Sequence, residues 1–520
     1  MVVAELRHRI ADSRPLSSAI VFIAGCAHSA GSAWPFSIGF VSGAPLWWLQ
    51  VAALTVLVVL LHSSTSWRQA ASLGWLFATT WLCGTFWWLY ISMHIYGGLN
   101  AFLTVLAIVA LALALGGYYA LACGIFWRLR GRTLALASLL FAALWTMAEM
   151  ARGTWLTGFG WGAVGYAHAD GPLAAFIPWV GAYGVGAIAA WLAAAVVFAV
   201  LGDTIVRVAF LAVVVAGLSL PLVLQGWSTS AGSLSVTLLQ GNIPQDEKFQ
   251  SGSGVPLALQ WYGEQLARST TDLVVAPETA IPLLPQDLPP DYWDALKTRF
   301  SNGSQAALAG FPMGDFAQGY TNSVLAFAPH ASQVWQYDKH HLVPFGEFIP
   351  PLFKWFTRLM NIPLGDFNRG AVGQASFRWK GQRLAPNICY EDLFGEELGA
   401  RFIDPATAPT IFVNVSNIGW FGDSVAIDQH LQISRMRSLE FERPMIRATN
   451  TGATVVIDHT GKVTHALPRL TRGALEATVE GRTGTTPFAW WVACFGLWPL
   501  WIAAFAIVSI AVYARRMGAQ

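Results

Sequence analysis

The sequence predicts an α/β domain attached to a bundle of about eight membrane-spanning helices. Only 12% of its 520 residues are charged and 55% are hydrophobic, whereas about 25% are charged in an ordinary soluble protein. The apolar residues gather in 1–225 and 488–520, while 226–487 carries charges, proline and glycine in ordinary amounts. Within 226–487, short β-rich segments alternate with helical patterns, which is typical of a layered α/β domain. We therefore divide the chain into a helical region, a globular domain and a final helix with a short tail.

The apolar regions contain eight candidate membrane spans. A helix needs about 20 apolar residues to cross the hydrocarbon core of a bilayer. The spans that meet this length are expected at residues 16–33, 36–60, 71–95, 101–127, 134–152, 174–201, 204–224 and 488–513. Glu149 and Arg152 lie three residues apart in the fifth span, a spacing that predicts an ion pair on one face of a helix.

Arginines in the short loops predict how these spans are oriented. Lys and Arg close to membrane helices remain on the cytoplasmic side. Arginines occur before the first span, between the second and third, between the fourth and fifth, and after the last, as at Arg14, Arg68, Arg128 and Arg515. The alternate loops at residues 32–35 and 94–100 contain neither Lys nor Arg. We therefore expect both termini in the cytoplasm and the globular domain on the opposite side of the membrane.

The globular domain shows strands and helices in alternation. The expected strands are 235–240, 273–276, 306–309, 323–327, 384–388, 410–415 and 454–457, and the expected helices are 256–268, 290–302 and 427–443. Catalytic groups in layered α/β domains lie where strands end and loops begin. Residues that directly follow the strands are therefore the candidates for a functional site.

Three residues meet that condition. Glu278 follows the strand 273–276, Cys389 follows the strand 384–388, and Lys339 follows a β-rich segment that ends at residue 337. A carboxylate, an ammonium and a thiol can together catalyse acyl transfer, with Glu278 taking the thiol proton as general base. A neighbouring cation and a helix N-terminus would lower the pKa of Cys389. Lys339 and backbone N–H groups after Cys389 would stabilise the oxyanion.

The cysteines and histidines narrow the chemistry further. Of the 5 cysteines, only Cys389 lies in 226–487, so this domain has no internal disulfide partner for it. A free thiol outside the cytoplasm suggests that Cys389 has a chemical role. The alternative is that Cys389 packs in the core as a small hydrophobic residue. Histidines such as His340, His341 and His430 show no metal-ligand spacing, so we expect no metal and no other cofactor. The net charge of +2 without a basic block excludes a nucleic-acid partner.

The segments around the three residues resemble the Glu–Lys–Cys signatures of the nitrilase superfamily. They read APETAIP around Glu278, YDKHHLVPFGEFIP around Lys339, NICYEDLFG around Cys389 and SNIGWFG at 416–422. Joined to many N-terminal spans and one C-terminal span, they resemble the apolipoprotein N-acyltransferase family within that superfamily. QGNIPQ at 240–245 and SLEFERP at 438–444 are similar to family segments too. The resemblance covers nearly the whole chain.

The resemblance implies a periplasmic nitrilase-like αββα domain on helices of the bacterial inner membrane. It also implies a ping-pong reaction that forms the last step of lipoprotein maturation. Cys389 would take an acyl chain from a phospholipid, typically phosphatidylethanolamine, as a thioester. The α-amine of a diacylglyceryl-cysteine at an apolipoprotein N-terminus would then accept that chain. Glu278 carries over as general base and Lys339 as stabiliser of the tetrahedral intermediate.

Further residues match family positions and receive expected roles from the resemblance. Glu347 and Glu391 are expected to orient Lys339 or balance its charge, and Tyr390 is expected to support the oxyanion region. The candidate substrate contacts are Phe249 and Trp420. Five further aromatic residues are interpreted as a lid at the membrane interface, namely Phe345, Phe348, Phe353, Trp355 and Phe356. The alternative is that they pack in the core of the domain.

Two other functions compete with acyl transfer. A membrane-tethered amidase or nitrilase would use the same chemistry to hydrolyse a C–N bond, with water as the acceptor. A transporter or sensor with a ligand-binding outer domain would need charges along a path through the spans, and the spans contain few. A lipid entrance to the site would separate the transferase from the hydrolase, because a hydrolase has no need of one.

Overall fold

The computed structural model describes residues 13–131, 133–223, 226–331, 333–349 and 367–517. Two compact units form within these residues. The first takes in the described parts of Met1–Tyr90, Ala101–Gly226 and Phe495–Gln520, and the second takes in Ile91–Asn100 and the described parts of Trp227–Cys494. The first unit is helical and the second is an α/β unit.

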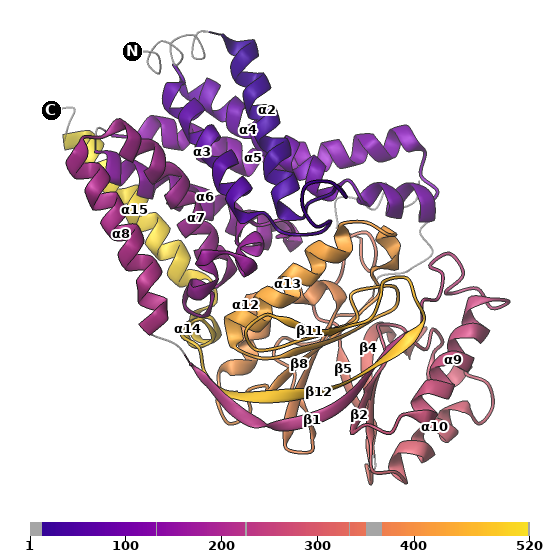
Figure 1. The fold of residues 1–520 in the computed structure, drawn as a ribbon. Helices are drawn as coiled ribbons and strands as arrows, with labels where there is room; N and C mark the ends of the chain where they lie inside the picture. The colour runs from indigo at the N-terminus through magenta and orange to yellow at the C-terminus, as the bar shows by residue number, and fades with distance from the viewer. Residues whose placement is uncertain (1–12, 132, 224–225, 332, 350–366, 518–520) are drawn as a thin grey trace. The chain divides into compact units, whose positions relative to one another are not determined.

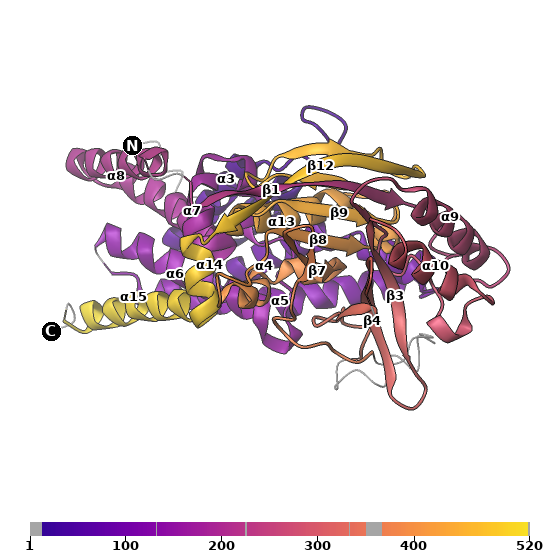
Figure 2. The ribbon, with the colours of Figure 1, turned by 90° about the horizontal axis from the view of Figure 1, so that it is seen from below.

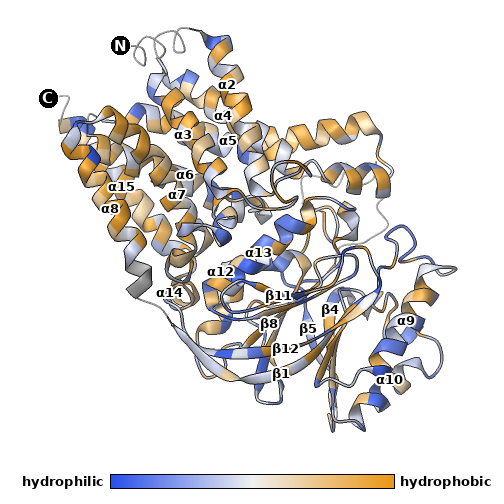
Figure 3. Cartoon of the chain, viewed as in Figure 1, coloured by the Kyte–Doolittle hydropathy of each residue, from blue (hydrophilic) through white to orange (hydrophobic). Residues whose placement is uncertain are grey.

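The helical unit has long helices at positions close to the eight expected spans. They are α2 (Arg14–Ser32), α3 (Trp47–Ser63), α4 (Trp67–Phe86), α5 (Ala101–Leu129), α6 (Leu134–Thr154), α7 (Ile177–Leu201), α8 (Thr204–Val223) and α15 (Trp498–Met517). Figure 3 shows apolar residues along most of their length. Among the described residues, four segments are long and apolar enough to cross a membrane, namely Ala101–Leu129, Leu134–Thr157, Pro172–Leu201 and Trp498–Met517. The count of about eight spans stays a prediction.

Two of the expected spans differ from the helices in the structure. The second was expected from residue 36, but α3 begins at Trp47, because Gly39 and Gly43 adopt positive φ angles of 84° and 81° in a turn-rich segment. The segment expected as one span over 488–513 is divided into α14 (Pro487–Phe495) and α15, with Gly496 between them at φ 56°. Glycine accepts such φ angles without steric cost, so both differences occur where glycine interrupts an apolar run.

The expected ion pair between Glu149 and Arg152 does not form. Arg152 Nη1 donates instead to the carbonyl oxygens of Phe159 (2.6 Å) and Trp161 (2.8 Å). Glu149 Oε1 accepts from the backbone N–H of Val164 at 2.9 Å. Both side chains therefore bind backbone groups of the segment 159–164, which follows α6. These groups need partners because they lie outside a regular helix.

Two six-stranded sheets form the α/β unit. The first has the order β12 (Gly473–Gly484), β1 (Ser228–Gln240), β2 (Leu273–Val275), β3 (Ala306–Asp315), β4 (Gly319–Phe327) and β5 (Trp335–Asp338). The second has the order β11 (Val463–Ala466), β10 (Val455–Ile457), β9 (Met445–Thr449), β8 (Ile411–Ser416), β7 (Gln382–Ile388) and β6 (Phe377–Trp379). The neighbours β1, β2 and β3 are parallel, as are β7, β8 and β9, and the outer strands pair antiparallel.

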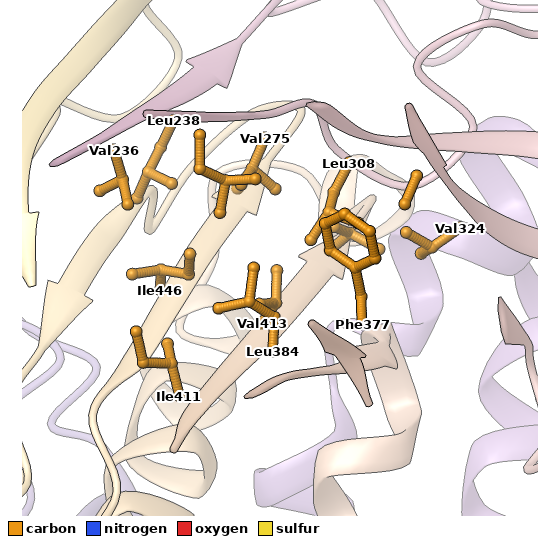
Figure 4. Close-up of a cluster of buried hydrophobic side chains, with 14 of the residues drawn as sticks. Val236, Leu238, Val275, Leu308, Val324, Phe377, Leu384, Ile411, Val413 and Ile446 are labelled. Atoms are coloured by element: carbon orange, nitrogen blue, oxygen red, sulfur yellow. The ribbon is translucent and has the colours of Figure 1, made fainter. Parts of the chain in front are cut away.

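Helices cover the outer faces of both sheets, which gives the expected αββα order of layers. Helices α9 (Gly254–Arg268) and α10 (Tyr292–Ser301) lie side by side and pack on the first sheet (Figures 1 and 2). The second sheet packs against α12 (Gly395–Gly399), α13 (Ala426–Phe441) and α14. Between the sheets lies a core of fully buried aliphatic side chains, such as Leu238, Val275, Leu384 and Val413 (Figure 4). Each such side chain stabilises the fold by about 1.5–3 kcal/mol.

All seven expected strands are present, and the structure adds five. Three of the additional strands are short: β5, β6 and β11. The fourth, β9, is fully buried, and the fifth, β12, pairs with β1 along most of its length. The first six residues of β12 alternate between half-buried and exposed, and the strand includes glycine and charged side chains. Such a strand lacks the apolar run by which the others were recognised.

Candidate active site

The three predicted site residues follow strands of the two sheets. Glu278 lies just beyond β2 and Lys339 directly after β5, both in the first sheet. Cys389 follows β7 in the second sheet and is the first residue of a short 3-10 helix, η7 (Cys389–Leu393). β2 and β5 run in the same direction, so Glu278 and Lys339 lie at the same edge of the first sheet. Cys389 comes from the second sheet, and the charges of Glu278 and Lys339 act on its thiol.

Glu278, Lys339 and Glu347 form a buried ion-pair network. Lys339 Nζ lies 3.2 Å from Glu278 Oε1 and 2.9 Å from Glu347 Oε1. Asn322 Nδ2 donates to the same two carboxylate oxygens, at 2.8 Å each. The side chain of Lys339 is only 1% exposed. Because an unpaired charge in such a place costs about 3–5 kcal/mol, these contacts hold one another in position.

Two further groups fix Glu278. Its second carboxylate oxygen, Oε2, accepts from the backbone N–H of Asn417 at 2.8 Å. Its carbonyl oxygen accepts from Nζ of Lys248 at 3.0 Å, and Lys248 is 2% exposed. Sequence reasoning missed Lys248, Asn322 and Asn417. Lys248 lies directly before Phe249, and this neighbour was the signal that could have drawn attention to it.

The protonation states follow from burial and from these contacts. Burial disfavours the charged form of Glu278, but Lys339, Lys248 and the Asn322 amide outweigh it and lower the pKa of Glu278. Burial also opposes the charge of Lys339, but Glu278 and Glu347 raise its pKa above the usual range. At neutral pH the pair is therefore a carboxylate and an ammonium.

Cys389 differs from the expectation of a lowered pKa. Burial and the charge of Glu278 raise the pKa of Cys389 to about 12, and Lys339 offsets only part of this rise. The 3-10 helix that begins at Cys389 has only five residues, so its dipole adds little. The resting site therefore holds a neutral thiol beside an ionised carboxylate that can accept its proton.

Cys389 also has an unusual backbone. Its φ angle is 52°, in the left-handed region, which costs about 1–3 kcal/mol for a residue other than glycine. Its carbonyl oxygen accepts from Asn414 Nδ2 at 3.3 Å and contacts His430 Nε2 at 3.2 Å. A sharp strand-to-helix turn of this kind presents a nucleophile at the end of a strand.

Glu391 forms hydrogen bonds with three backbone groups and one hydroxyl, and the charge of Lys339 acts on its carboxylate as well. Its donors are the N–H groups of His340 (2.6 Å), His341 (3.2 Å) and Ile388 (2.6 Å) and the hydroxyl of Tyr337 (2.8 Å). One carboxylate thus ties the end of β5 to the end of β7. These are the two strands that carry Lys339 and Cys389.

The aromatic candidates lie around this network. The ring of Tyr390 is buried and packs against those of Phe394 (5.3 Å between centroids) and His341 (5.7 Å). Phe249 is 50% exposed, and Nζ of Lys248 lies 5.8 Å from its ring centroid. The oxyanion role of Tyr390 and the substrate contact of Phe249 stay predictions.

Trp420 belongs to the 3-10 helix η9 (Ile418–Phe421), three residues after Asn417. Its ring lies at 89° and 5.9 Å from that of Tyr96, in the π-helix η1 (Ile91–Tyr96). Of the expected lid, the structure describes Phe345 and Phe348, and Arg369 lies over the ring of Phe348 at 4.8 Å. Phe353, Trp355 and Phe356 lie outside the described residues. In the described parts of the chain, no three His, Cys, Asp or Glu side chains are grouped so that they could hold a metal ion.

Known proteins resemble this chain over most of its length. The family model described as Apolipoprotein N-acyltransferase N-terminal domain matches residues 31–195, and the model described as Carbon-nitrogen hydrolase matches residues 235–488. A protein of Verminephrobacter eiseniae named apolipoprotein N-acyltransferase is 56% identical, over 95% of this chain and 96% of the relative. A protein of the same name from Ralstonia nicotianae is 45% identical, over 90% of each chain. Among solved structures, Saccharomyces cerevisiae Nit3, of the nitrilase superfamily, is 14% identical, with a TM-score of 0.36, over 49% of this chain and 92% of its own.

Proposed function

This chain belongs to the apolipoprotein N-acyltransferase family, and we propose that it transfers an acyl chain from a phospholipid to an apolipoprotein through a thioester on Cys389. The observation that carries the proposal is the buried Glu278–Lys339 pair beside a neutral thiol on a strained turn. A base, a cation and a nucleophile are the parts that acyl transfer requires.

The first half-reaction forms the acyl-enzyme. Sγ of Cys389 attacks the carbonyl carbon of the phospholipid ester, and the thiol proton passes to the Glu278 carboxylate. The negative charge that develops on the carbonyl oxygen is stabilised by the ammonium of Lys339, which is fixed in advance by two carboxylates. The ester C–O bond then breaks, and Glu278 returns the proton to the glycerol oxygen. A lysophospholipid leaves and a thioester remains.

The second half-reaction releases the acyl chain to the acceptor. The neutral α-amine of the diacylglyceryl-cysteine attacks the thioester carbonyl and gives a proton to Glu278. The C–S bond breaks, and the proton on Glu278 restores the Cys389 thiol. Since the same carboxylate takes and returns a proton in each half, its ionised resting state suits both.

The membrane is the source of both substrates in this proposal. The donor, which we propose to be phosphatidylethanolamine, and the diacylglyceryl acceptor both have acyl chains in a bilayer. We propose that the chain lies in the bacterial inner membrane, with both termini cytoplasmic and the α/β unit in the periplasm. Four described helices suited to crossing a membrane and the arginines of alternate loops support this arrangement.

Family membership favours the transferase over its alternatives. A tethered hydrolase would share the carbon–nitrogen hydrolase match at 235–488, but it would have no reason to match the N-terminal domain of apolipoprotein N-acyltransferases at 31–195. A transporter or sensor would have no use for a base, a cation and a thiol held together. The distinction between transferase and hydrolase therefore depends on the acceptor.

Intact mass spectrometry tests the proposal. Purified protein is incubated with phosphatidylethanolamine, and a diacylglyceryl-cysteine peptide is then added. We expect one hydroxylamine-sensitive acyl mass on the wild type and none on Cys389→Ser, followed by its transfer to the peptide amine. Loss of the acyl mass to water at the same rate with and without peptide would identify a hydrolase. An equal acyl mass on Cys389→Ser would exclude Cys389 as the carrier.

A further inference from the structure

A second buried polar cluster lies behind the nucleophile, and the mechanism above does not use it. It consists of Asp392 in η7, His430 and Ser434 in α13, and Arg447 in β9. None of these four side chains is more than 1% exposed. Three elements that are distant in sequence therefore bring an acid, an imidazole and a guanidinium together beside the carbonyl of Cys389.

The contacts of His430 determine where its proton lies. Arg447 Nη2 is 3.1 Å from His430 Nδ1. A guanidinium can only donate, so Nδ1 must be the acceptor and the ring hydrogen is on Nε2. Nε2 lies 3.0 Å from Asp392 Oδ1 and 3.2 Å from the carbonyl oxygen of Cys389, and both of these are acceptors. His430 is therefore held as one neutral tautomer, and it cannot take the thiol proton while these bonds persist.

The remaining members close the network. Asp392 Oδ2 accepts from the Ser434 hydroxyl and lies 3.4 Å from Arg447 Nη1. Arg447 Nη1 also donates to the carbonyl oxygen of His430 at 3.2 Å. One carboxylate faces one guanidinium, so the buried charges balance. A buried ion pair seldom stabilises a fold more than apolar packing would. Stability therefore does not explain why Asp392 and Arg447 lie beside Cys389.

We propose that Asp392, His430 and Arg447 are positioning residues that hold the carbonyl of Cys389 and thereby aim its thiol at the acyl donor. The proposal rests on the proposed function. His430 Nε2–H binds the Cys389 oxygen from one element and Asn414 Nδ2 binds it from another. This carbonyl and the N–H of Tyr390 belong to one planar trans peptide unit, so both are fixed together. Cys389 has a strained, left-handed backbone conformation. These two hydrogen bonds keep that conformation from relaxing.

Two substitutions of His430 test the proposal, because one should lower the rate of acyl-enzyme formation and the other should keep most of it. The amide nitrogen of Gln reaches about as far as Nε2, so His430→Gln keeps a donor for the Cys389 carbonyl, whereas His430→Asn is too short to do so. We expect the single-turnover rate of acyl-enzyme formation in His430→Asn to fall about 10- to 100-fold, since small misplacements of a reacting group have effects of this size. His430→Gln should recover most of that rate. The KM for phosphatidylethanolamine should change little in either variant, because no lipid contact is removed.

Asp428→Asn is the matched control. Asp428 lies on the same helix, α13, two residues before His430, and pairs with Arg469. It therefore reports general damage to the helix, and its acylation rate should match the wild type. An unchanged rate in His430→Asn, or a rate in His430→Gln as low as that of His430→Asn, would overturn the proposal.

Nitrogen NMR of the full chain with labelled histidine provides a readout that needs no turnover. The signal of His430, assigned by its loss in His430→Gln, should show a hydrogen on Nε2 and none on Nδ1. A hydrogen on Nδ1, or on both nitrogens, would contradict the network. Failure of the proposed function is distinguishable, because the wild type would then form no acyl-enzyme while the tautomer would still be observed.

Discussion

Two clusters of buried charge in the described α/β unit lie beside Cys389, and they differ in whether their groups can exchange protons with its thiol. The first joins Glu278, Lys339 and Glu347, and the second joins Asp392 and Arg447 through His430. Both lie almost out of reach of water. The first adjoins the thiol of Cys389, and the ionised carboxylate of Glu278 can receive the thiol proton. In the second, the Nη1 and Nη2 groups of Arg447 and the Nε2 hydrogen of His430 point to acceptors.

The difference lies in charge balance and not in burial. In the first cluster, two carboxylates share Lys339, and Lys248 is bonded only to a carbonyl oxygen of Glu278 among the contacts described. Glu278 can therefore gain a proton while Lys339 keeps Glu347 as its ion-pair partner. In the second, loss or gain of a proton would leave a buried charge alone, which is costly. Similar groups thus serve chemistry in one place and positioning in the other.

Removal of the shared cation should have the largest effect. Lys339→Met leaves two carboxylates without the ammonium that pairs with both of them, so we expect a loss of about 3–5 kcal/mol in stability. Acyl-enzyme formation should fall at least about 100- to 1,000-fold, as for the loss of an oxyanion donor. Thermal unfolding and single-turnover mass spectrometry measure the two effects. Lys297→Met is the control, since Lys297 is a half-exposed lysine of α10, and a similar loss there would contradict the assignment.

Removal of the base separates chemistry from stability. Glu278→Gln keeps the shape of the side chain, and Lys339 retains Glu347, so the protein should fold. The acylation rate should fall about 100- to 10,000-fold, the usual contribution of general base catalysis. Glu264→Gln, on the surface of α9, should leave the rate unchanged. If Glu278→Gln formed the thioester at nearly the wild-type rate, another group would have to be the base.

The pH dependence of the acylation rate tests how the Asn322 amide affects the pKa of Glu278. Burial works to raise the pKa of Glu278, and Lys339, Lys248 and Asn322 work to lower it, with a net shift downward. The wild-type rate should therefore not fall through Glu278 protonation until the pH is below the usual glutamate range of about 4.3. Asn322→Ala removes one lowering contact, so its acid limb should move to higher pH, and its rate near neutral pH should fall about tenfold. An unmoved limb in the pH–rate profile would show that Asn322 does not act on Glu278.

Substitution of Lys248 should have the smallest effect, and it should raise stability where the substitution of Lys339 lowers it. Burial lowers the pKa of Lys248 to about 8, although Glu278 and Cys389 oppose the shift, and an unfolded lysine has a pKa of about 10.4. Between these values the unfolded chain binds more protons, so stability should rise with pH across this window. Lys248→Met should unfold at a higher temperature at pH 7 and lose that rise with pH. A lower unfolding temperature at pH 7 would mean that the buried ammonium stabilises the fold.

Residues that follow strands could be predicted from sequence, and their partners from other segments could not. Glu278, Lys339 and Cys389 were found because each follows a β-rich segment of the sequence. Asn322 lies within β4 and looks like any polar strand residue until its side chain meets two carboxylates. Asn417 lies in the SNIGWFG segment, but nothing in the sequence shows that its backbone N–H donates to Glu278.

The second cluster was invisible for the same reason. His430 was set aside as a histidine without metal-ligand spacing, and Arg447 lies in β9, a strand that was not expected. Only the packing of α13 on the second sheet brings them to Asp392. The layered fold was predictable because periodicity determines strands and helices locally, whereas the start of α3 depended on the conformations of two glycines.

The pH dependence of Cys389 alkylation tests the central claim, that burial and the charge of Glu278 together keep the resting thiol neutral. Peptide mapping after iodoacetamide treatment measures Cys389 apart from the other four cysteines. Because the pKa of Cys389 is raised to about 12, alkylation should be slow at pH 7 and should accelerate about tenfold per pH unit up to pH 10. Glu278→Gln, which removes a negative charge, should be alkylated faster than the wild type at each pH. A wild-type rate that is already at its plateau near pH 7, or an identical profile in Glu278→Gln, would contradict the account.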